Sequence, residues 1–367
     1  MTEHYEIFVG PNHPGVTGNF SIHVWLEGDI ITKLRPDYGY LHRGFEKLME
    51  RRETIRNISL VPRICVPEPD INENLYARVI EAVDDIEVPP RAKYIRTMIL
   101  EMARIGAYLL QIASSGSAIG NHTVAEWAVG DRDLLLDIFE WITGARVYHI
   151  YQLPGGVRKD LPEGVLEKLW DYLDYLEKRI PDYDYLLFEN PVALNRWKGT
   201  IVVTPEEVEK FGLSGPPAKA AGVAIDVRKD SPYEAYPELE FDIPVEFSGD
   251  AYARMRIVRR EILLSISLLR QIINRMPKGE FFNRPPNFKK WVPEAGETYQ
   301  SLESSRGEYA YYAVFDGKNS APRRVYVKGP SYATGTSFME YKLKGERLEN
   351  IPVFLTTFNI CPPEIDR

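Results

Sequence analysis

The feature that most constrains the fold is a long stretch with helical periodicity in the first third of the chain. Large apolar side chains recur there every three or four positions, which places them on one face of an α-helix. The members of this stripe are Ile95, Met98, Met102, Ile105, Leu109 and Ile112. The spacing predicts a helix of about twenty residues, and its apolar face has to pack against other elements.

Three more segments have the pattern of helices. In "RDLLLDIFEWIT", Asp131 is a candidate N-cap and Gly144 a candidate stop. A third helix fits "EGVLEKLWDYLDYLEKR", and a fourth is expected from Asp250 to Met276, where Pro277 ends it. The middle of the chain is therefore predicted to be a helical bundle.

Both ends of the chain alternate in the way that half-buried strands do. "FSIHVWLE" and "IITKLRP" flank a Gly28-Asp29 turn, and "GEYAYYAVFDG" and "PRRVYVKGP" form a second candidate hairpin. The predicted fold class is α+β, with a long-helix bundle as the core and small antiparallel sheets from the N- and C-terminal segments. We expect one domain over residues 1–367: β-rich at 1–40, helical at 45–277 with an irregular insert at 181–250, a loop at 280–306, and β-rich at 307–367.

Composition excludes several classes of function. The net charge of −8 gives no general basic field for a phosphate backbone, so nucleic-acid binding is not expected. No run approaches the roughly 18 to 20 apolar residues of a membrane span, and the N-terminus lacks the layout of a signal peptide. A cytoplasmic location is therefore expected.

Two short motifs contain the only cysteines of the chain. "RICVPE" has Cys65 three positions before Glu68, and "CPPE" has Cys361 three positions before Glu364. A single cysteine is usually a small buried hydrophobe, and a glutamate on a proline-rich turn is usually a surface residue. The repeated Cys-x-x-Glu spacing raises the question of a shared site.

Several segments together carry a resemblance to a known family: "GPNHPG" at 10–15, "GYLHRGFEKL" at 39–48, "ITGARVYHIYQLPGGVRKDLPEG" at 142–164, "RKDSPYEAY" at 228–236, "FDIPVEFSGDAY" at 241–252 and the terminal "EIDR". The chain resembles, over nearly its whole length, the large subunit shared by respiratory complex I (the 49 kDa subunit family) and the membrane-bound NiFe hydrogenases. The resemblance implies a fold like that of the NiFe hydrogenase large subunit.

The hydrogenases of this family hold nickel and iron with two pairs of thiolates. In each matching motif of this chain the first thiol is kept and the second is a glutamate, Glu68 or Glu364. Carboxylates are hard ligands, whereas nickel and low-spin iron suit thiolates, so we expect no NiFe centre. Zinc accepts both ligand types and stays an alternative, although no metal is expected.

The quinone-reducing branch of the family differs from this chain in the pocket that binds the quinone headgroup. That branch has a His-Pro-x-x-His-Gly loop and a tyrosine, whose counterparts here are Thr17 and Val66. Both groups expected to hydrogen-bond a quinone are thus missing. A complex I-like quinone or methanophenazine oxidoreductase subunit and a non-catalytic coupling scaffold remain the alternatives, and hydrogen evolution ranks third.

One branch of the family is compatible with the missing thiolates and with the missing quinone-binding groups. It is the archaeal membrane-bound sulfane (polysulfide) reductase. This resemblance implies a catalytic-type subunit of a ferredoxin-dependent complex that reduces sulfane sulfur to sulfide and pumps ions. The implied partners are a small subunit with the proximal 4Fe-4S cluster, further iron-sulfur subunits and antiporter-like membrane subunits, with ferredoxin as donor. With two cysteines, the chain holds no cluster itself. It would be peripheral, on the cytoplasmic face of the membrane.

The resemblance also assigns candidate roles to individual residues. Cys65 and Cys361 are candidates for exchange with a sulfur-sulfur bond, and Glu68 and Glu364 for proton donation. A second group is expected beside the partner's cluster or in the pocket wall, and it comprises Arg43, Arg63, His42 and His13. His122 and His149 are expected to be ordinary packed or surface residues.

Overall fold

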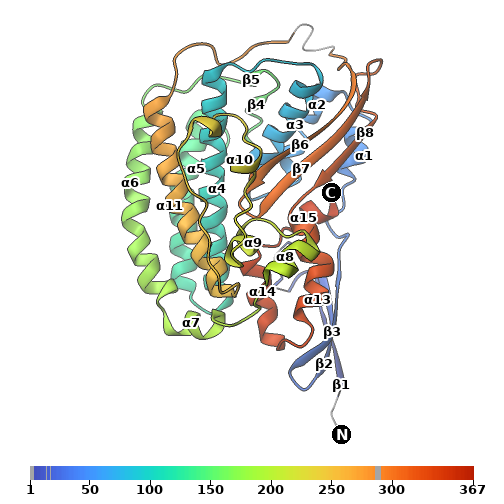
Figure 1. Cartoon of the computed structure of the whole chain (residues 1–367), viewed down its shortest axis with the longest axis vertical. Helices are drawn as coiled ribbons and strands as arrows, with labels where there is room; N and C mark the ends of the chain where they lie inside the picture. Colours follow the sequence, from blue (N-terminus) through green and yellow to red (C-terminus); the bar gives the residue numbers. More distant parts are fainter. Residues whose placement is uncertain (1–3, 14, 17, 286–290) are drawn as a thin grey trace.

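A tall bundle of long helices forms one side of the molecule, and two small sheets lie along the other side (Figure 1). The computed structural model describes residues 4–13, 15–16, 18–285 and 291–367. The long helices of this bundle are α4 (Pro90–Ala118), α5 (His122–Thr143), α6 (Val165–Tyr183) and α11 (Ala251–Arg275), and a fifth helix, α3 (Pro69–Val83), lies beside the C-terminal sheet. The predicted bundle is confirmed, and α4 is longer than expected because the whole apolar stripe and its flanks are buried.

The helix ends follow the capping signals in part. Gly144 ends α5 in the left-handed conformation, as predicted, and α11 starts next to Asp250 as expected, with Asp250 as its N-cap accepting from the backbone N–H of Ala253. The prediction that Asp131 caps a helix is wrong, because α5 already begins at His122 with Asn121 as its cap. Asp131 lies inside α5 and is buried, where α6 supplies its hydrogen-bond donors.

The N-terminal sheet has the order β1-β2-β3, with antiparallel pairing throughout. Its strands are β1 (His4–Val9), β2 (Ser21–Glu27) and β3 (Ile30–Asp37). The predicted hairpin is β2–β3, and its apolar face is buried through Phe20, Ile22 and Val24. Strand β1 was not predicted.

The C-terminal sheet has the order β6-β7-β8. Strands β7 (Gly307–Asp316) and β8 (Arg324–Lys328) are the predicted pair. Strand β6 (Ala295–Ser304) corrects the expected loop at 280–306, because its residues pair along their full length with β7. A short turn at residues 305 and 306 joins β6 to β7.

The expectation that residues 307–367 are β-rich is wrong beyond β8. Short helices follow instead: α12 (Ser331–Ala333), a turn of π-helix (Thr334–Phe338), α13 (Met339–Leu343), a 3-10 turn (Leu348–Asn350), α14 (Ile351–Thr357) and α15 (Pro362–Asp366). Proline at the start of α14 and α15 favours helix initiation. These helices bury Val353, Phe354 and Leu355 against the bundle rather than extending a sheet edge.

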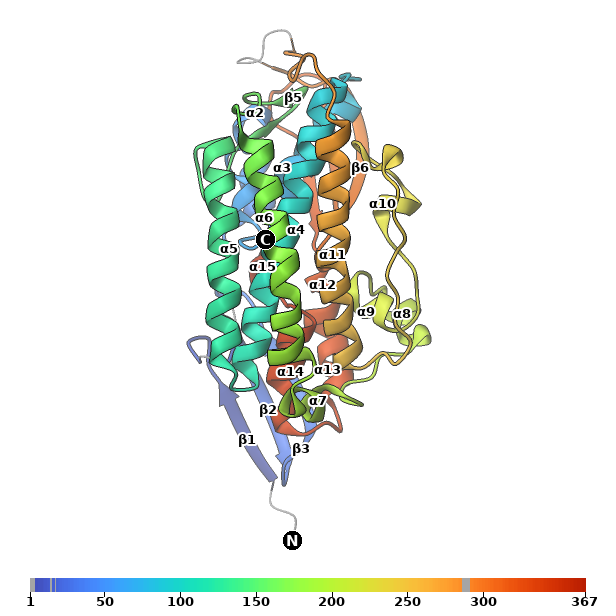
Figure 2. The same ribbon diagram turned by 90° about the vertical axis from the view of Figure 1, so that its left-hand side faces the viewer.

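The expected irregular insert at 181–250 holds four short helices. They are α7 (Pro191–Trp197), α8 (Pro205–Phe211), α9 (Pro216–Ala220) and α10 (Val227–Asp230), with a turn of π-helix (Asp184–Phe188) and a 3-10 turn (Tyr236–Glu238). Figure 2 shows α8, α9 and α10 on the opposite side of α11 from α5 and α6. The remaining elements are α1 (Phe45–Met49), α2 (Thr54–Asn57), a 3-10 turn (Val61–Arg63), β4 (Gln152–Leu153) and β5 (Gly156–Val157).

Most buried apolar side chains of the bundle and of both larger sheets belong to one continuous cluster, and Ala220, Ala253 and Ile257 form a small second cluster. Within the described ranges, no helix combines the length and hydropathy needed to cross a membrane.

Candidate functional site

The two Cys-x-x-Glu segments lie together in the folded chain. Glu68 is the N-cap residue of α3, and Cys361 is the N-cap residue of α15, so a proline-initiated helix begins at each motif. The Sγ atoms of Cys65 and Cys361 and a carboxylate oxygen of Glu364 all lie within 4.8 Å of one another. The fold thus brings together two segments from opposite ends of the sequence.

An arginine that the sequence did not single out connects these groups. Arg306 comes from the turn between β6 and β7, and its side chain is 1% exposed. Its Nη2 lies 2.7 Å from the Sγ of Cys65 and 3.4 Å from a carboxylate oxygen of each glutamate. Its Nε and Nη1 are buried without a hydrogen-bond partner within the described part of the chain. In the sequence, Arg306 is one polar residue next to the predicted strand that begins at Gly307. Nothing in that position connects it to the cysteines.

Glu68 is fully buried, and the same turn holds it in place. The backbone N–H of Ser305 donates to Glu68 at 3.0 Å, and the hydroxyl of Ser305 donates to its other oxygen. Burial raises the pKa of Glu68, while the positive charges of Arg306 and Arg104 act in the opposite direction. The carboxyl can therefore hold a proton at a higher pH than an exposed glutamate.

Glu364 is also fully buried, and its surroundings leave no spare volume. The backbone N–H of Ser331 donates to Glu364 at 2.8 Å, and Arg306 lies on its other oxygen. A Cβ atom at Gly329 would lie 2.9 Å from the side chain of Glu364. Glycine at this position therefore allows the carboxyl to stay beside the thiols.

The two thiols differ in exposure and surroundings. Cys65 is 1% exposed, whereas Cys361 is 5% exposed and forms part of the wall of a cavity. Burial raises the pKa of the Cys65 thiol, the neighbouring Cys361 adds to this, and Arg306 opposes it. Cys65 is thus the inner thiol, beside the guanidinium of Arg306, and Cys361 is the outer thiol, at the cavity.

The cavity has a volume of about 460 Å³. Its wall is mainly apolar and includes Leu41, Val66, Leu110, Ile360 and Pro363. Arg43 is the charged residue among its lining side chains. A cavity of this kind admits an apolar chain better than a strongly hydrated ion.

The four residues expected near a cluster or in the pocket wall lie in different places. Arg43 lines the cavity and donates to the backbone carbonyl of Arg63 at 2.9 Å. The guanidinium of Arg63 lies 5.1 Å from the centre of the Tyr148 ring and donates to the carbonyl of Ser59. Only Arg43 of this pair therefore reaches the cavity.

The two histidines of this group are exposed and make local contacts. The Nδ1 of His42 lies 2.6 Å from the backbone carbonyl of Asp366, which ties the "LHRG" loop to the end of the chain. The Nδ1 of His13 accepts from the backbone N–H of Gly15. Thr17, where the quinone-reducing branch has a histidine, lies outside the described residues.

His149 and His122 were expected to be ordinary packed or surface residues. His122 is the exposed first residue of α5. His149 is buried, with its Nδ1 2.7 Å from Asp70 and its ring stacked on Phe139 at 4.4 Å. Burial lowers the pKa of His149, but Asp70 and Glu73 outweigh it and raise the pKa overall. It is a packed, ion-paired residue.

The donor set does not fit the NiFe centre that the hydrogenase branch of the family holds. The cluster offers two thiols and two carboxylates in place of four thiolates, and carboxylates are poor ligands for low-spin iron. A guanidinium already lies on Cys65 and beside both carboxylates. A second cation at this point, including zinc, would meet that positive charge at short range.

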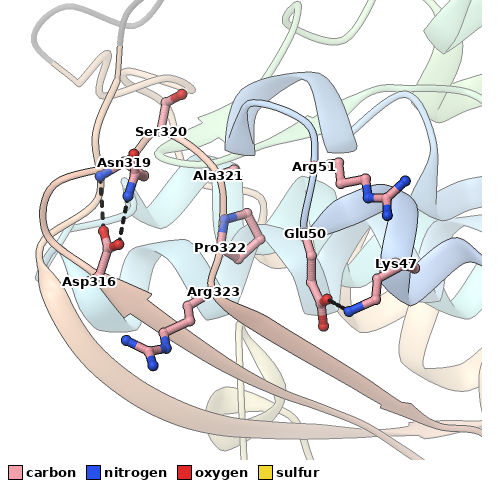
Figure 3. A pocket seen from close by; sticks show the side chains of 9 residues that line it. All are labelled: Lys47, Glu50, Arg51, Asp316, Asn319, Ser320, Ala321, Pro322 and Arg323. Carbon is pink, nitrogen blue, oxygen red and sulfur yellow. Dashed lines mark hydrogen bonds and ion pairs between the residues drawn. The ribbon is translucent and has the colours of Figure 1, made fainter.

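A larger hollow of about 610 Å³ lies elsewhere, between α1 and the β7–β8 turn (Figure 3). Its lining is polar: Lys47 forms an ion pair with Glu50, and the side-chain amide of Asn319 donates to Asp316. Among its described lining residues there is no thiol. Size alone therefore does not select the candidate site, because the thiols lie at the smaller cavity.

Comparison with known proteins gives consistent matches. The family model described as "Respiratory-chain NADH dehydrogenase, 49 Kd subunit" matches residues 118–293 and 285–367. An NADH-quinone oxidoreductase subunit of Thermosipho melanesiensis is 46% identical over 366 residues, covering 99% of each chain. An F(420)H(2) dehydrogenase subunit of Methanosarcina mazei is 35% identical, covering 100% of this chain and 99% of the relative.

A solved structure also matches the fold nearly throughout. It is a chain of the membrane-bound sulfane sulfur reductase, described as an archaeal respiratory membrane complex. The TM-score is 0.96 at 41% sequence identity, and the match covers 99% of this chain and 98% of the other. The structural similarity is thus not confined to the helical bundle.

Proposed function

The chain belongs to the family of the respiratory-chain NADH dehydrogenase 49 kDa subunit, and from this premise we propose that it reduces sulfane sulfur within a membrane-bound respiratory complex. The observation that carries the proposal is the convergence of two thiols, two carboxyls and one guanidinium at a mainly apolar cavity of about 460 Å³. The substrate class is a chain containing sulfur-sulfur bonds, and the products are sulfide or shortened thiols.

The cavity supports sulfur chemistry more than quinone chemistry. A quinone needs hydrogen-bond partners for two oxygens, and Val66 lines the cavity where the quinone-reducing branch has a tyrosine. A sulfur chain needs no such partners, and thiolates attack sulfur-sulfur bonds directly. Cys361 lies in the wall of the cavity, where such an attack begins.

Protons are available from the buried carboxyls. Reduction of one sulfur-sulfur bond consumes two electrons and two protons. Glu68 has a pKa raised by burial, and Glu364 lies with the thiols within 4.8 Å. We assign both the role of proton donors to the leaving sulfur.

Electrons come from outside the chain in this proposal. Both cysteines are at the site, so no thiolates remain to ligate an iron-sulfur cluster. A small partner subunit would hold the proximal 4Fe-4S cluster, supplied by ferredoxin through further iron-sulfur subunits. Antiporter-like membrane subunits would couple the reaction to ion pumping, with this chain peripheral on the cytoplasmic face. Arg43 would face that cluster from the cavity wall.

The test is sulfide release by the purified complex with reduced ferredoxin and polysulfide. We expect the wild type to release sulfide and Cys361→Ala to lose at least about a hundredfold in rate, because the attacking thiol is gone. Arg323→Gln in the larger hollow is the matched control and should keep the wild-type rate. A wild-type complex that releases no sulfide would reject the proposal.

A second candidate is a complex I-like quinone or methanophenazine oxidoreductase subunit. The favouring observation is the 46% identity to a subunit of an NADH-quinone oxidoreductase. The same preparation should be assayed with a soluble quinone and a phenazine as acceptors. Quinone reduction that is unaffected by Cys361→Ala, without sulfide release, would select this candidate. A non-catalytic scaffold has less support, because the outer thiol faces an open cavity.

A further inference from the structure

The two thiols of the site are arranged one behind the other. Cys361 lies in the cavity wall, and Cys65 is not among the residues that line the cavity. Cys65 lies further inside, 1% exposed, with the guanidinium of Arg306 2.7 Å from its Sγ. A substrate in the cavity therefore meets Cys361 first, and Cys65 has access only to what is attached to Cys361.

The thiols are close enough to react with each other. Their Sγ atoms lie within 4.8 Å, and a disulfide needs a separation of about 2.05 Å. Rotation about χ1 is the motion by which either sulfur would approach the other. The chain has only these two cysteines, so each thiol has the other as its one possible partner within the chain.

The guanidinium of Arg306 can stabilise the negative charge that forms on sulfur during the reaction. Its Nε and Nη1 are buried and have no hydrogen-bond partner in the described ranges of the chain. Buried donors without partners are costly and are rarely left in place without a ligand or water. Beside two thiols, such donors suit a thiolate or a hydropersulfide anion.

We propose that Cys361 is the attacking thiol and Cys65 the resolving thiol, so that each turnover passes through a Cys65–Cys361 disulfide. This inference rests on the proposed function and assigns distinct roles to the two cysteines. The alternative, in which the thiols only shape the cavity and the partner's cluster reduces the substrate directly, predicts no such disulfide.

The reaction can be written for an organic trisulfide, R–S–S–S–R. The Cys361 thiol passes its proton to a buried carboxylate, and its thiolate attacks a terminal sulfur, forming Cys361–S–S–R and expelling R–S–S⁻, which takes that proton back from the carboxyl. The Cys65 thiolate then attacks Cys361, forming the Cys65–Cys361 disulfide and expelling R–S⁻, which takes up the proton of Cys65. Two electrons from the external donor, which the proposed function assigns to a partner subunit's 4Fe-4S cluster, and two protons would return both thiols.

A single-turnover experiment on the intact complex tests this order. The complex is reduced with a phosphine, desalted without oxygen, and mixed with dimethyl trisulfide while no electron donor is present. Released methanethiol and methyl hydropersulfide are counted, and free thiols are then alkylated for peptide mass spectrometry. Wild type, Cys65→Ser and Cys361→Ser are compared, with Arg323→Gln as the control for handling and folding.

We expect the wild type to release two product equivalents per complex and to yield a peptide pair linked through Cys65 and Cys361. Cys65→Ser should release one equivalent and retain a methylthio group on Cys361. Cys361→Ser should release less than about a tenth of an equivalent. The wild-type peptide link needs no variant, so it is informative even where a serine variant misfolds.

Two results would overturn the inference. One is steady-state sulfide release by the wild type with no Cys65–Cys361 link in single turnover; the other is Cys65→Ser turning over at the wild-type rate. Failure of the proposed function is a different result: the link forms from trisulfide, but reduced ferredoxin never restores the thiols and no sulfide accumulates. That outcome supports the order of attack and rejects the electron route.

Discussion

Two clusters of buried charge lie in this molecule, and they differ in the number of cations that face their carboxyls and in the presence of an adjoining cavity. The first is the site cluster, formed by Cys65, Glu68, Arg306, Cys361 and Glu364. The second is the core ion network, formed by Lys219, Asp226, Arg228 and Glu261 together with Glu101, Arg104 and Glu303. The charged side chains of both are at most 2% exposed.

Most charges in the core ion network take part in more than one ion pair, although the Nη1 of Arg104 and the Oε1 of Glu303 have no hydrogen-bond partner among the described residues. The Nζ of Lys219 lies 2.6 Å from Asp226 and 2.7 Å from Glu261. Arg228 contacts the same two carboxylates at 2.7 Å and 2.9 Å. Three cations face four carboxyls, and burial with the charge of Asp226 raises the pKa of Glu303 to about 7. The network is therefore close to neutral, and the residues around it have no reason to react.

In the site cluster one guanidinium serves two carboxyls and a thiol, and two of its donors have no partner among the described residues. The cluster also adjoins a cavity, which the core ion network does not do in the described cavities. Incomplete pairing leaves groups with shifted pKa values available to a substrate. Buried charge and unpaired polar atoms occur in both clusters, so the adjoining cavity and the thiols are what distinguish the candidate site.

The largest expected effect on stability follows from removing a cation of the core ion network. Lys219→Met leaves Asp226 and Glu261 with one cation fewer in a dry environment, so the free energy of unfolding should fall by about 3–5 kcal/mol. Thermal unfolding of the complex measures this. Lys229→Met is the matched control, because Lys229 is exposed and its loss should cost about 0.5–1 kcal/mol. Equal losses in the two variants would contradict the account of the network.

Next in size is the effect of removing a proton donor from the site cluster. Glu68→Gln keeps an acceptor for Ser305, so stability should change little, while sulfide release should fall about 10²–10⁴-fold. The wild-type rate should decline as pH rises through the raised pKa of Glu68, because only the protonated carboxyl donates. A pH-rate profile should lack this decline in the variant. Glu340→Gln on the surface is the control, and an unchanged profile in Glu68→Gln would assign the proton to another group.

The smallest expected effect concerns pH and the core ion network. Burial raises the pKa of Glu303 from 4.5 to about 7, so the folded state binds its proton more tightly than the unfolded state. Stability from this group is thus fully present below pH 4.5 and is lost as pH rises towards about 7, by about 1–3 kcal/mol. Glu303→Gln should flatten this decline in unfolding midpoints measured from about pH 4.5 to about pH 7.5. In the variant a smaller decline of stability with pH should remain, because the pKa of Glu73 is also raised to about 7. A variant as pH-dependent as wild type would assign the decline to other groups.

Sequence patterns predicted the bundle better than the sheets. Apolar stripes and the caps at Asp250 and Gly144 are local signals, so the corresponding helices were located from the residues. Strand β6 was missed because its residues are mostly polar, and their pairing with β7 depends on neighbours in the fold. Asp131 was misassigned as a cap because the tyrosines that satisfy it come from α6.

The candidate site could be predicted in composition but not in arrangement. The paired motifs and the family resemblance selected Cys65, Glu68, Cys361 and Glu364, and these residues do lie together. No spacing rule pointed to Arg306, which is 241 residues from the thiol that it contacts. Roles near a cluster were assigned equally to Arg43 and Arg63, yet only Arg43 lines the cavity.

By itself the sequence determined the class of fold, the family and the replacement of one thiol by a glutamate in each of the two motifs, because periodicity and motif identity are written in neighbouring residues. Only the tertiary structure decided which thiol meets the cavity, which cation balances the carboxyls, and which buried charges form several ion pairs. The physical reason is that these properties depend on distance and burial, and chain segments far apart in sequence set both.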